Sequence, residues 1–317
     1  MTTIFFATDV HGADSCFKKF LKAADFYKAD VLILGGDVSG KVLIPLIEQS
    51  DGTYRVNFAG TEITANTREE LEKIEEQARF VGYYPFRTDP HEYEDLTNDK
   101  EKVSSLTMKL ILERLRNWIV TAQEFLRDKQ VKCYVTGGND DPYEIEDILK
   151  ASENPFDPEG QVVEIAGSYQ MISCSYSNHT PWKTPRELSE EDLTKTIEKM
   201  CEKIGDFKNA IFNFHVPPFD SLIDSAPKLD VSVFPPKPIL KGGVVFVPVG
   251  STAVRAAIEK YQPLLGLHGH IHESRGKIRL GRTLCLNPGS SYGEGTLLGA
   301  LVKLEDGKVK TYQLTSG

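Results

Sequence analysis

The sequence predicts one domain over residues 1–317 with a layered α/β fold, in which sheets are covered on both faces. Ile4 to Thr8 is a short apolar run that ends in polar residues, the helical pattern of Ser15 to Tyr27 follows, and Val31 to Leu34 is a second apolar run. This order is a strand, helix, strand unit. Both strands are continuously apolar rather than alternating, which is typical of strands buried on both faces.

The segment from Ser50 to Gln130, or about residues 50–130, has a different pattern and is predicted to be an insertion in this domain. Tyr54 to Phe58 and Thr61 to Thr64 flank a glycine-containing turn, which predicts a β-hairpin. Two amphipathic helical patterns follow, at Thr67 to Phe80 and at about Glu101 to Arg127. The residues Tyr83 to Phe86 and the acidic stretch Asp89 to Asp99 connect these two helices.

The strand pattern resumes at Val131 to Thr136, and a further helix is predicted to begin near Pro142. Helices are also predicted at Glu187 to Ile204 and at Thr252 to Lys260. The proline-rich stretch from Val216 to Pro238 is expected to be an ordered loop. The other predicted strands are Gln161 to Ile165, Met171 to Tyr176, Ala210 to Phe214, Pro263 to Leu267, Gly276 to Leu280, Thr283 to Leu286, Leu297 to Lys303 and Lys308 to Leu314.

Composition indicates a globular protein and argues against duplex nucleic acid as a partner. The hydrophobic share of 40% and the charged share of 26% are ordinary for a globular chain. The formal net charge of −9 opposes attraction to a nucleic-acid backbone, which is normally met by a basic surface. A small phosphorylated substrate is expected instead, because bound divalent ions supply positive charge locally. The composition leaves a homo-oligomer open.

The chain carries no pattern of secretion or membrane insertion. Its N-terminus lacks the cationic region and the long apolar stretch of a signal peptide, and no segment approaches the roughly 20 apolar residues that span a bilayer. The five cysteines are widely spaced and form no CxxC pair, which argues against a disulfide framework or a zinc–thiolate site. We therefore expect a cytoplasmic protein with no membrane partner.

Five short elements with potential metal ligands occur in order, each at the end of an apolar strand-like run. Alone, a GD or GN dipeptide is more often a simple turn. Together the elements are a strong signal, and they contain four of the seven histidines in the chain. They are Asp9-Val10-His11, Gly36-Asp37, Gly138-Asn139, His215 and Gly269-His270-Ile271-His272.

The ligand types and their spacing favour a site with two transition-metal ions. Imidazole nitrogens with carboxylate and amide oxygens suit Mn, with Fe or Zn as alternatives. In Asp-x-His and His-x-His, alternate residues of an extended segment point the same way, so two ligands converge. Asp37 is the best candidate to bridge two ions about 3.5 to 4 Å apart, the spacing that stabilises in-line displacement at phosphorus. A hydroxide that bridges the ions is then the expected nucleophile.

With these motifs, the chain resembles the calcineurin-like metallophosphoesterase superfamily, whose motifs are DxH, GD, GN, H and GHxH. The resemblance continues to the turn Asn287-Pro288-Gly289-Ser290 and covers the chain except the insertion. It implies a four-layer αββα sandwich, with two β-sheets flanked by helices, and a phosphoric ester hydrolase. It also implies two metal sites, one formed by Asp9, His11, Asp37 and His272, the other by Asp37, Asn139, His215 and His270.

One position departs from the family's pattern. Many relatives have a histidine after the GN dipeptide, where it is thought to help protonate the leaving group, and this chain has Asp140. An ionised aspartate donates no proton, and its unperturbed pKa of about 3.9 makes the acid form scarce at neutrality unless the site raises it. Branches of the family without that histidine often favour phosphodiesters. We therefore expect a phosphodiesterase that acts on a small nucleotide-like substrate.

Two further histidines need an interpretation. His179 lies in a loop with Trp182 and Lys183, which could contact the base and phosphate of a substrate, although a plain surface loop has equal support. His268 is not a family ligand and is expected to pack beside the last motif or to support its ligands. The candidate catalytic residues are therefore Asp37, Asn139, Asp140 and His179.

Two other functions share these motifs. One is a nuclease of the double-strand-break repair type, which the acidic charge and the lack of a basic stripe disfavour. The other is a non-catalytic scaffold on the same fold, as in the metallophosphoesterase-like subunit of retromer. Scaffolds of that kind usually have eroded ligand positions, whereas this chain keeps all seven.

The insertion is expected to narrow access to the metal site. It begins soon after Asp37 and ends shortly before Asn139, so both of its ends are tied to the edge of the sheet where the ligands are expected. Its role otherwise stays open, because the same pattern fits a segment that only adds bulk.

Overall fold

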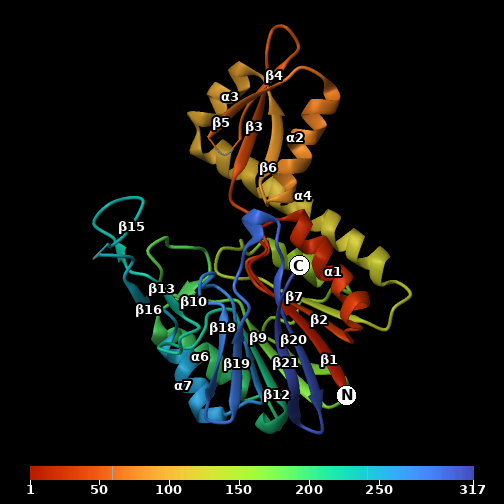
Figure 1. The fold of residues 1–317 in the computed structure, drawn as a ribbon, viewed down its shortest axis with the longest axis vertical. Coiled ribbons are helices and arrows are strands. Elements are labelled where there is room, and N and C mark those ends of the chain that lie inside the picture. The colour runs from red at the N-terminus through yellow and green to blue at the C-terminus, as the bar shows by residue number, and fades with distance from the viewer. Residues whose placement is uncertain (59, 241) are drawn as a thin grey trace.

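A computed structural model describes residues 1–58, 60–240 and 242–317 of the chain. It shows the predicted four-layer sandwich, with the insertion standing on top of it in Figure 1. The two central layers are β-sheets, and helices form the two outer layers. The four-layer α/β fold class that the sequence predicts is therefore confirmed.

The first sheet has the strand order β21-β20-β1-β2-β7. Its parallel part consists of β1 (Thr2–Ala7), β2 (Val31–Gly35) and β7 (Lys132–Thr136). An antiparallel pair, β20 (Leu298–Glu305) and β21 (Lys308–Ser316), extends the sheet on the other side of β1. Every residue of β1 and β2 is buried, which explains why both strands are continuously apolar in the sequence.

The second sheet has the order β18-β19-β17-β12-β9-β8. Its four central strands are parallel to one another, and the two edge strands, β18 and β8, are antiparallel to their neighbours. The strands are β8 (Val162–Ile165), β9 (Tyr169–Cys174), β12 (Ala210–Phe214), β17 (Leu265–Leu267), β18 (Gly276–Leu280) and β19 (Thr283–Asn287).

The two sheets pack face to face around one apolar core. Phe6 and Ile33 from the first sheet meet Met171, Ile211 and Leu286 from the second in a single buried cluster. Because these side chains leave water together, they fix how the strand ends of one sheet lie against those of the other.

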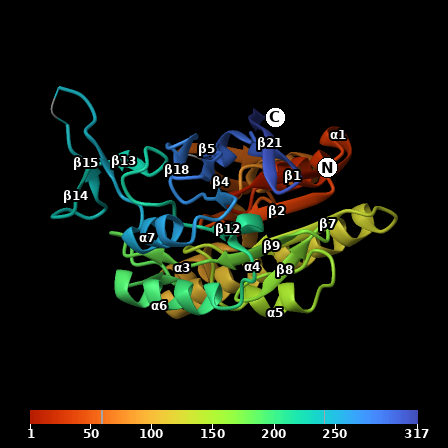
Figure 2. The same ribbon diagram turned by 90° about the horizontal axis from the view of Figure 1, so that it is seen from below.

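Helices cover the outer face of each sheet, as the view in Figure 2 shows. The first sheet is covered by α1 (Asp14–Tyr27), α4 (Lys100–Leu126) and α5 (Ile145–Lys150), which share a buried cluster with it. The second is covered by α6 (Glu190–Cys201) and α7 (Thr252–Tyr261). Helix α6 begins later than predicted because Ser189 caps it through the backbone N–H of Asp192 and the residues before it form a strand.

The insertion has a sheet and a small core of its own. The predicted hairpin and the two amphipathic helices are present, as β4, β5, α2 and α4. The segment that connects the helices forms β6 and α3, and β6 pairs with β3, an unpredicted strand that lies before Ser50. These elements are β3 (Leu43–Glu48), β4 (Tyr54–Phe58), β5 (Thr61–Ala65), α2 (Arg68–Phe80), β6 (Tyr84–Thr88) and α3 (Pro90–Thr97).

The described residues of 225–249 form an extended segment that we call the arm, to the left of the sandwich in Figure 1. Part of the expected proline-rich loop lies here and contains short paired strands: β13 pairs with β16, and β14 with β15. The arm strands are β13 (Ser225–Pro227), β14 (Leu229–Asp230), β15 (Lys237–Pro238) and β16 (Phe246–Pro248). The remaining short elements are β10 (Ser177–Asn178), β11 (Glu187–Leu188) and the 3₁₀ turns η1 (Phe207–Asn209) and η2 (Tyr292–Glu294).

Within the described ranges, no helix combines the length and the apolar character that a bilayer span requires. The five cysteines are all buried with free thiols. Burial raises the pKa of Cys133 and Cys285, the latter to about 12, so these thiols stay protonated at neutral pH.

A substitution in the core between the two sheets tests how the sheets pack. Phe6 is 0% exposed, and Phe6→Ala should lower the free energy of unfolding by about 3–5 kcal/mol, because it leaves a cavity where both sheets meet. Urea unfolding followed by circular dichroism measures this loss. Phe26 is 80% exposed, so Phe26→Ala is the matched control and should stay within about 0.5 kcal/mol of the wild type. Equal losses for the two variants would contradict the sandwich packing.

Candidate metal centre

The seven predicted ligands all lie just beyond the carboxyl ends of parallel strands. Such edges are where ligands gather in open α/β sheets, because the loops that leave the strands there are free to carry polar groups. Here the edges of both sheets contribute. Asp9 and His11 follow β1, Asp37 follows β2, Asn139 follows β7, His215 follows β12, and His270 and His272 follow β17.

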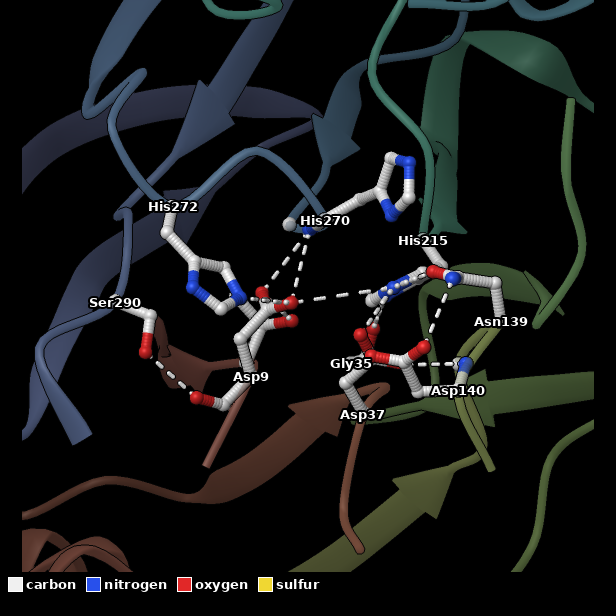
Figure 3. A network of polar contacts seen from close by, with 12 residues as sticks. Asp9, Gly35, Asp37, Asn139, Asp140, His215, His270, His272 and Ser290 are labelled. Carbon is white, nitrogen blue, oxygen red and sulfur yellow. Dashed lines mark hydrogen bonds and ion pairs between the residues drawn. The ribbon is translucent and has the colours of Figure 1, made fainter. Parts of the chain in front are cut away.

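Figure 3 shows that ligand side chains from both sheets lie close together, among them those of Asp9, Asp37, His215 and His272. The ligand atoms form two groups, and within each group they all lie within 4.8 Å of one another: Asp9, His11, Asp37 and His272 form the first group, and Asp37, His215 and His270 the second. Asp37 is the residue that the groups share. Asn139 joins the second group, since its Oδ1 lies 3.1 Å from His215 Nε2.

The loops that carry the ligands have unusual backbone conformations. Asp9, His11, Asp37 and His270 have φ values of 54°, 41°, 48° and 65°, in the left-handed region. Residues other than glycine rarely adopt it, although Asp and His do so more often than most, and it persists where surrounding contacts enforce it. Backbone hydrogen bonds do this here: His11 N donates to Asp37 O at 2.9 Å, so the loop after β1 is tied to the loop after β2.

The glycine of the GN motif has a steric role. A Cβ on Gly138 would overlap both the backbone N and the carboxylate of Asp37 and would press on the His215 ring. The space beside Asp37 therefore exists only because residue 138 has no side chain. The motif thus joins a predicted ligand, Asn139, to a glycine that lets the shared carboxylate approach.

Without cations, the cluster balances its carboxylates with protons on histidine. Burial alone would raise the pKa of Asp9, but the hydrogen bond from His272 and the charge of His215 outweigh it and lower the pKa to about 2. Burial likewise opposes charge on His215, yet the carboxylate of Asp37 raises its pKa to about 10. Burial lowers the pKa of His11 and His270 to about 4, so these rings are neutral.

The donor set fits divalent ions better than it fits protons alone. His11 Nε2 lies 3.1 Å from His272 Nε2, so two ring nitrogens face each other although only one of them can donate in a hydrogen bond. His215 Nδ1 lies 3.0 Å from Gly35 O and can donate to it, which leaves Nε2 free to bind an ion. Imidazole nitrogens, carboxylates and an amide oxygen around one buried space are ligands for Mn, Fe or Zn.

Asp140 lies beside the cluster, and its partner is a residue that sequence reasoning missed. Lys41 forms an ion pair with Asp140, whose backbone N donates to Asp37 Oδ1 at 2.9 Å. Burial and then the charge of Asp37 outweigh the lysine and raise the pKa of Asp140 to about 7. The acid form of Asp140 is therefore accessible near neutrality. Lys41 comes four residues after Asp37, and that proximity is the one signal for it in the sequence.

Two buried charged residues behind the cluster, Asp141 and Arg186, fix the positions of its loops. The Asp141 carboxylate accepts hydrogen bonds from the backbone N of Val38, Ser39 and Gly138 at 2.9, 2.7 and 2.8 Å. It therefore joins the loop after β2 to the loop after β7. Arg186 is 1% exposed, and its Nε donates to Asp141 O at 2.9 Å. Nothing in its sequence surroundings marks Arg186 for this role.

A cleft of about 730 Å³ opens over the cluster. Its floor contains His11, Asp37, Asn139 and His270, and its walls come from the loop of residues 178–184 and from the arm. No described residue between Ser50 and Gln130 lines it, so its walls come from other segments, and narrowing of the access by the insertion stays a prediction.

The insertion instead supports the loops of the site from behind. Arg114 Nη1 donates to Gly12 O at 2.6 Å, next to His11. Gly40 N donates to the hydroxyl of Tyr84 at 3.0 Å, next to Lys41.

The structure separates His179 and His268 from the ligands. His179 lines the cleft, but its side chain is 70% exposed, and its Nδ1 lies 3.5 Å from Glu187 Oε2. It belongs to a wall of the cleft and not to the cluster. His268 is buried with its Nδ1 2.9 Å from Phe214 O, as expected for a packing residue. Burial lowers its pKa to about 4, so its ring is neutral.

Comparisons with known proteins give a likeness of fold. No family model matches the chain. Over 153 residues it is 28% identical to MJ1162, an uncharacterized protein of Methanocaldococcus jannaschii. The match covers 48% of this chain and spans about three fifths, 61%, of the length of that protein. One crystal structure aligns with a TM-score of 0.61 and 16% identity over 99% of this chain and 98% of the other. TT1561 of Thermus thermophilus aligns with a TM-score of 0.52 and 13% identity over 100% and 98%.

The shared carboxylate gives a direct prediction. Asp37→Asn removes one negative charge from both groups of ligands, so it should abolish the binding of both ions and not of one alone. Elemental analysis after reconstitution with Mn and desalting measures the stoichiometry, which should be two per wild-type chain and close to zero in the variant. Asp51→Asn, in an exposed turn, is the control and should keep two ions. One ion retained by Asp37→Asn would contradict a shared ligand.

Proposed function

We propose that the protein is a metal-dependent phosphoesterase that hydrolyses phosphodiesters of small nucleotide-like molecules. The observation that carries this proposal is the position of Asp37 in both groups of ligands. A carboxylate that two ions share holds them close together, which is the arrangement used for in-line displacement at phosphorus. The resemblance of the motifs to the calcineurin-like metallophosphoesterases supports the same reaction.

Each group of ligands has a defined task in this proposal. Asp9, His11, Asp37 and His272 would hold one ion, and Asp37, Asn139, His215 and His270 the other, with Mn as the preferred metal and Fe or Zn as alternatives. When bound, the ions would supply a nucleophile at neutral pH and positive charge for the phosphoryl oxygens. The chain itself orients the ligands: Asp9 accepts hydrogen bonds from His270 N at 3.1 and 3.0 Å, and Ser290 Oγ donates to Asp9 O at 2.6 Å.

The size and charge of the cleft favour a small substrate. A volume of about 730 Å³ lies within the range of about 300 to 1,000 Å³ that is typical of small-molecule pockets. The chain as a whole has a net charge of −9, which disfavours a long polyanion. Lys41 and Lys228 line the cleft and add positive charge where a phosphorylated molecule would enter.

Asp140 is the proposed proton donor for the leaving group. It lies at the floor of the cleft beside Asp37, and its hydrogen-bond and ion-pair partners fix its position. His179 is the other candidate, because it also lines the cleft. A test that compares leaving groups in variants of both residues therefore decides which of the two donates the proton.

A screen of the Mn-loaded protein tests the reaction class. Bis(p-nitrophenyl) phosphate should be hydrolysed with a higher kcat/KM than p-nitrophenyl phosphate, and cyclic nucleotides or dinucleoside polyphosphates faster than plasmid DNA. Turnover should disappear on chelation and in Asp37→Asn. A faster reaction with the monoester would contradict the diester preference. Turnover confined to plasmid DNA would favour the nuclease, and a metal-loaded protein without any turnover would favour the scaffold.

Proton donation by Asp140 predicts a leaving-group effect. An alkoxide leaves poorly without a proton, whereas p-nitrophenolate leaves readily, so Asp140→Asn should slow diesters with alkyl leaving groups by about 10²- to 10⁴-fold and p-nitrophenyl esters far less. His179→Ala is the comparison. A uniform loss across both leaving groups in Asp140→Asn would assign it a structural role only.

A further inference from the structure

The cleft over the metal centre has a charged floor and largely apolar walls. Its lining includes Trp182, which remains 59% exposed. From the arm it includes Pro227, Val231, Pro236 and Val247. A simple alkyl phosphate would occupy the floor and leave these walls in water. The walls therefore match a substrate with a sizeable apolar group next to its phosphate.

The loop that carries Trp182 is held in place and connected to the metal ligands. The Glu187 carboxylate accepts hydrogen bonds from Thr180 Oγ1 at 2.5 Å and from Thr184 N at 2.8 Å. The backbone N of Trp182 donates to Thr180 Oγ1 at 3.2 Å. Asn139 Nδ2 donates to Thr184 Oγ1 at 2.9 Å, so the loop is joined to a metal ligand. The exposed indole is thus presented from a fixed position relative to the cluster.

Polar residues also line the cleft, among its apolar residues. They decide which kind of apolar substrate group the cleft accepts. Asn178 Nδ2 donates to Val249 O at 3.3 Å and so joins the loop to the arm. Asn178 Oδ1 is buried and has no hydrogen-bond partner among the described residues, although Asn178 lines the cleft. A hydrocarbon chain would leave this acceptor unpaired, whereas an amino or imino group on a heteroaromatic ring would pair with it.

We propose that Trp182, Asn178 and the arm form a subsite for a heteroaromatic ring, such as a nucleobase, attached to the phosphodiester. This assignment rests on the proposed function, because it places the phosphate over the Asp37 cluster. The indole is flat and the proline rings have little conformational freedom, so a planar ring can pack against them without ordering a flexible surface. The polar edge of the ring then faces Asn178.

Diesters that share one leaving group test the subsite. Each carries p-nitrophenolate, and the retained group is methyl, octyl or 5′-thymidyl, so differences in kcat/KM report only on the retained group. The ratio of kcat/KM for the thymidyl ester to that for the methyl ester should exceed about tenfold in the wild type. Trp182→Ala and Val231→Asp should each reduce this ratio about tenfold. Phe26→Ala removes an exposed aromatic far from the cleft lining and should preserve it.

The outcomes distinguish the subsite from the reaction. Equal kcat/KM values for methyl and thymidyl esters would overturn the subsite and leave the phosphodiesterase intact. An octyl ester that gains as much as the thymidyl ester would replace the ring site by a hydrocarbon site. No turnover of any ester would contradict the proposed function, and a binding measurement then decides the subsite.

Intrinsic fluorescence supplies that binding measurement without catalysis. The chain has two tryptophans, and Trp118 is only 5% exposed, so quenching by a bound nucleotide reports mainly on Trp182. Titration with thymidine 5′-phosphate should give saturable quenching in the wild type, and Trp182→Phe should remove most of it. No saturable quenching, or equal quenching in Trp182→Phe, would overturn the subsite.

Discussion

The buried Asp37 carboxylate is the constraint on which the rest of the site depends. It is 2% exposed, so its negative charge has lost most of its hydration and needs compensation from neighbours. Burial would raise its pKa, yet the charge of His215 outweighs burial and holds the pKa well below the usual range. Every other part of the cluster can be understood from this charge: histidines and an amide surround it, and a glycine stands where any side chain would displace it.

The fold supplies what the carboxylate requires. The apolar core between the sheets brings the strand ends after β1, β2 and β7 against those after β12 and β17. Neither sheet holds a complete ligand group, since each group takes residues from both. The cluster therefore forms only when the sheets pack together. The insertion and Arg186 add rigidity from behind the site, while the arm and the loop of residues 178–184 form the cleft in front of it.

Much of this arrangement could be predicted from the sequence, and the failures have physical causes. Continuous apolar runs give strands buried on both faces, and the ligand motifs follow those runs directly, so the layered fold and the seven converging residues were accessible. Strands β3 and β6 were missed because each contains a proline, Pro45 or Pro85, which lacks a backbone N–H and weakens a strand pattern. Helix α3 was missed although Asp89 and Pro90 form a recognisable helix start.

The surroundings of the site depended on contacts between distant segments. Lys41 and Asp140 are far apart in the sequence, and nothing local announces their ion pair. The lining of one cleft by both the arm and Trp182 follows from the tertiary packing, which the local sequence does not reveal. The pKa of Asp140 likewise depends on burial, which composition and motif spacing do not reveal.

We propose that one carboxylate, that of Asp37, organises two ions. A crystal structure of the Mn-reconstituted protein, with anomalous difference maps recorded at the Mn absorption edge, would show this arrangement. We expect two anomalous peaks about 3.5 to 4 Å apart, with Asp37 in contact with both and the remaining ligands divided as the two groups require. A single peak, or two peaks of which only one contacts Asp37, would contradict it.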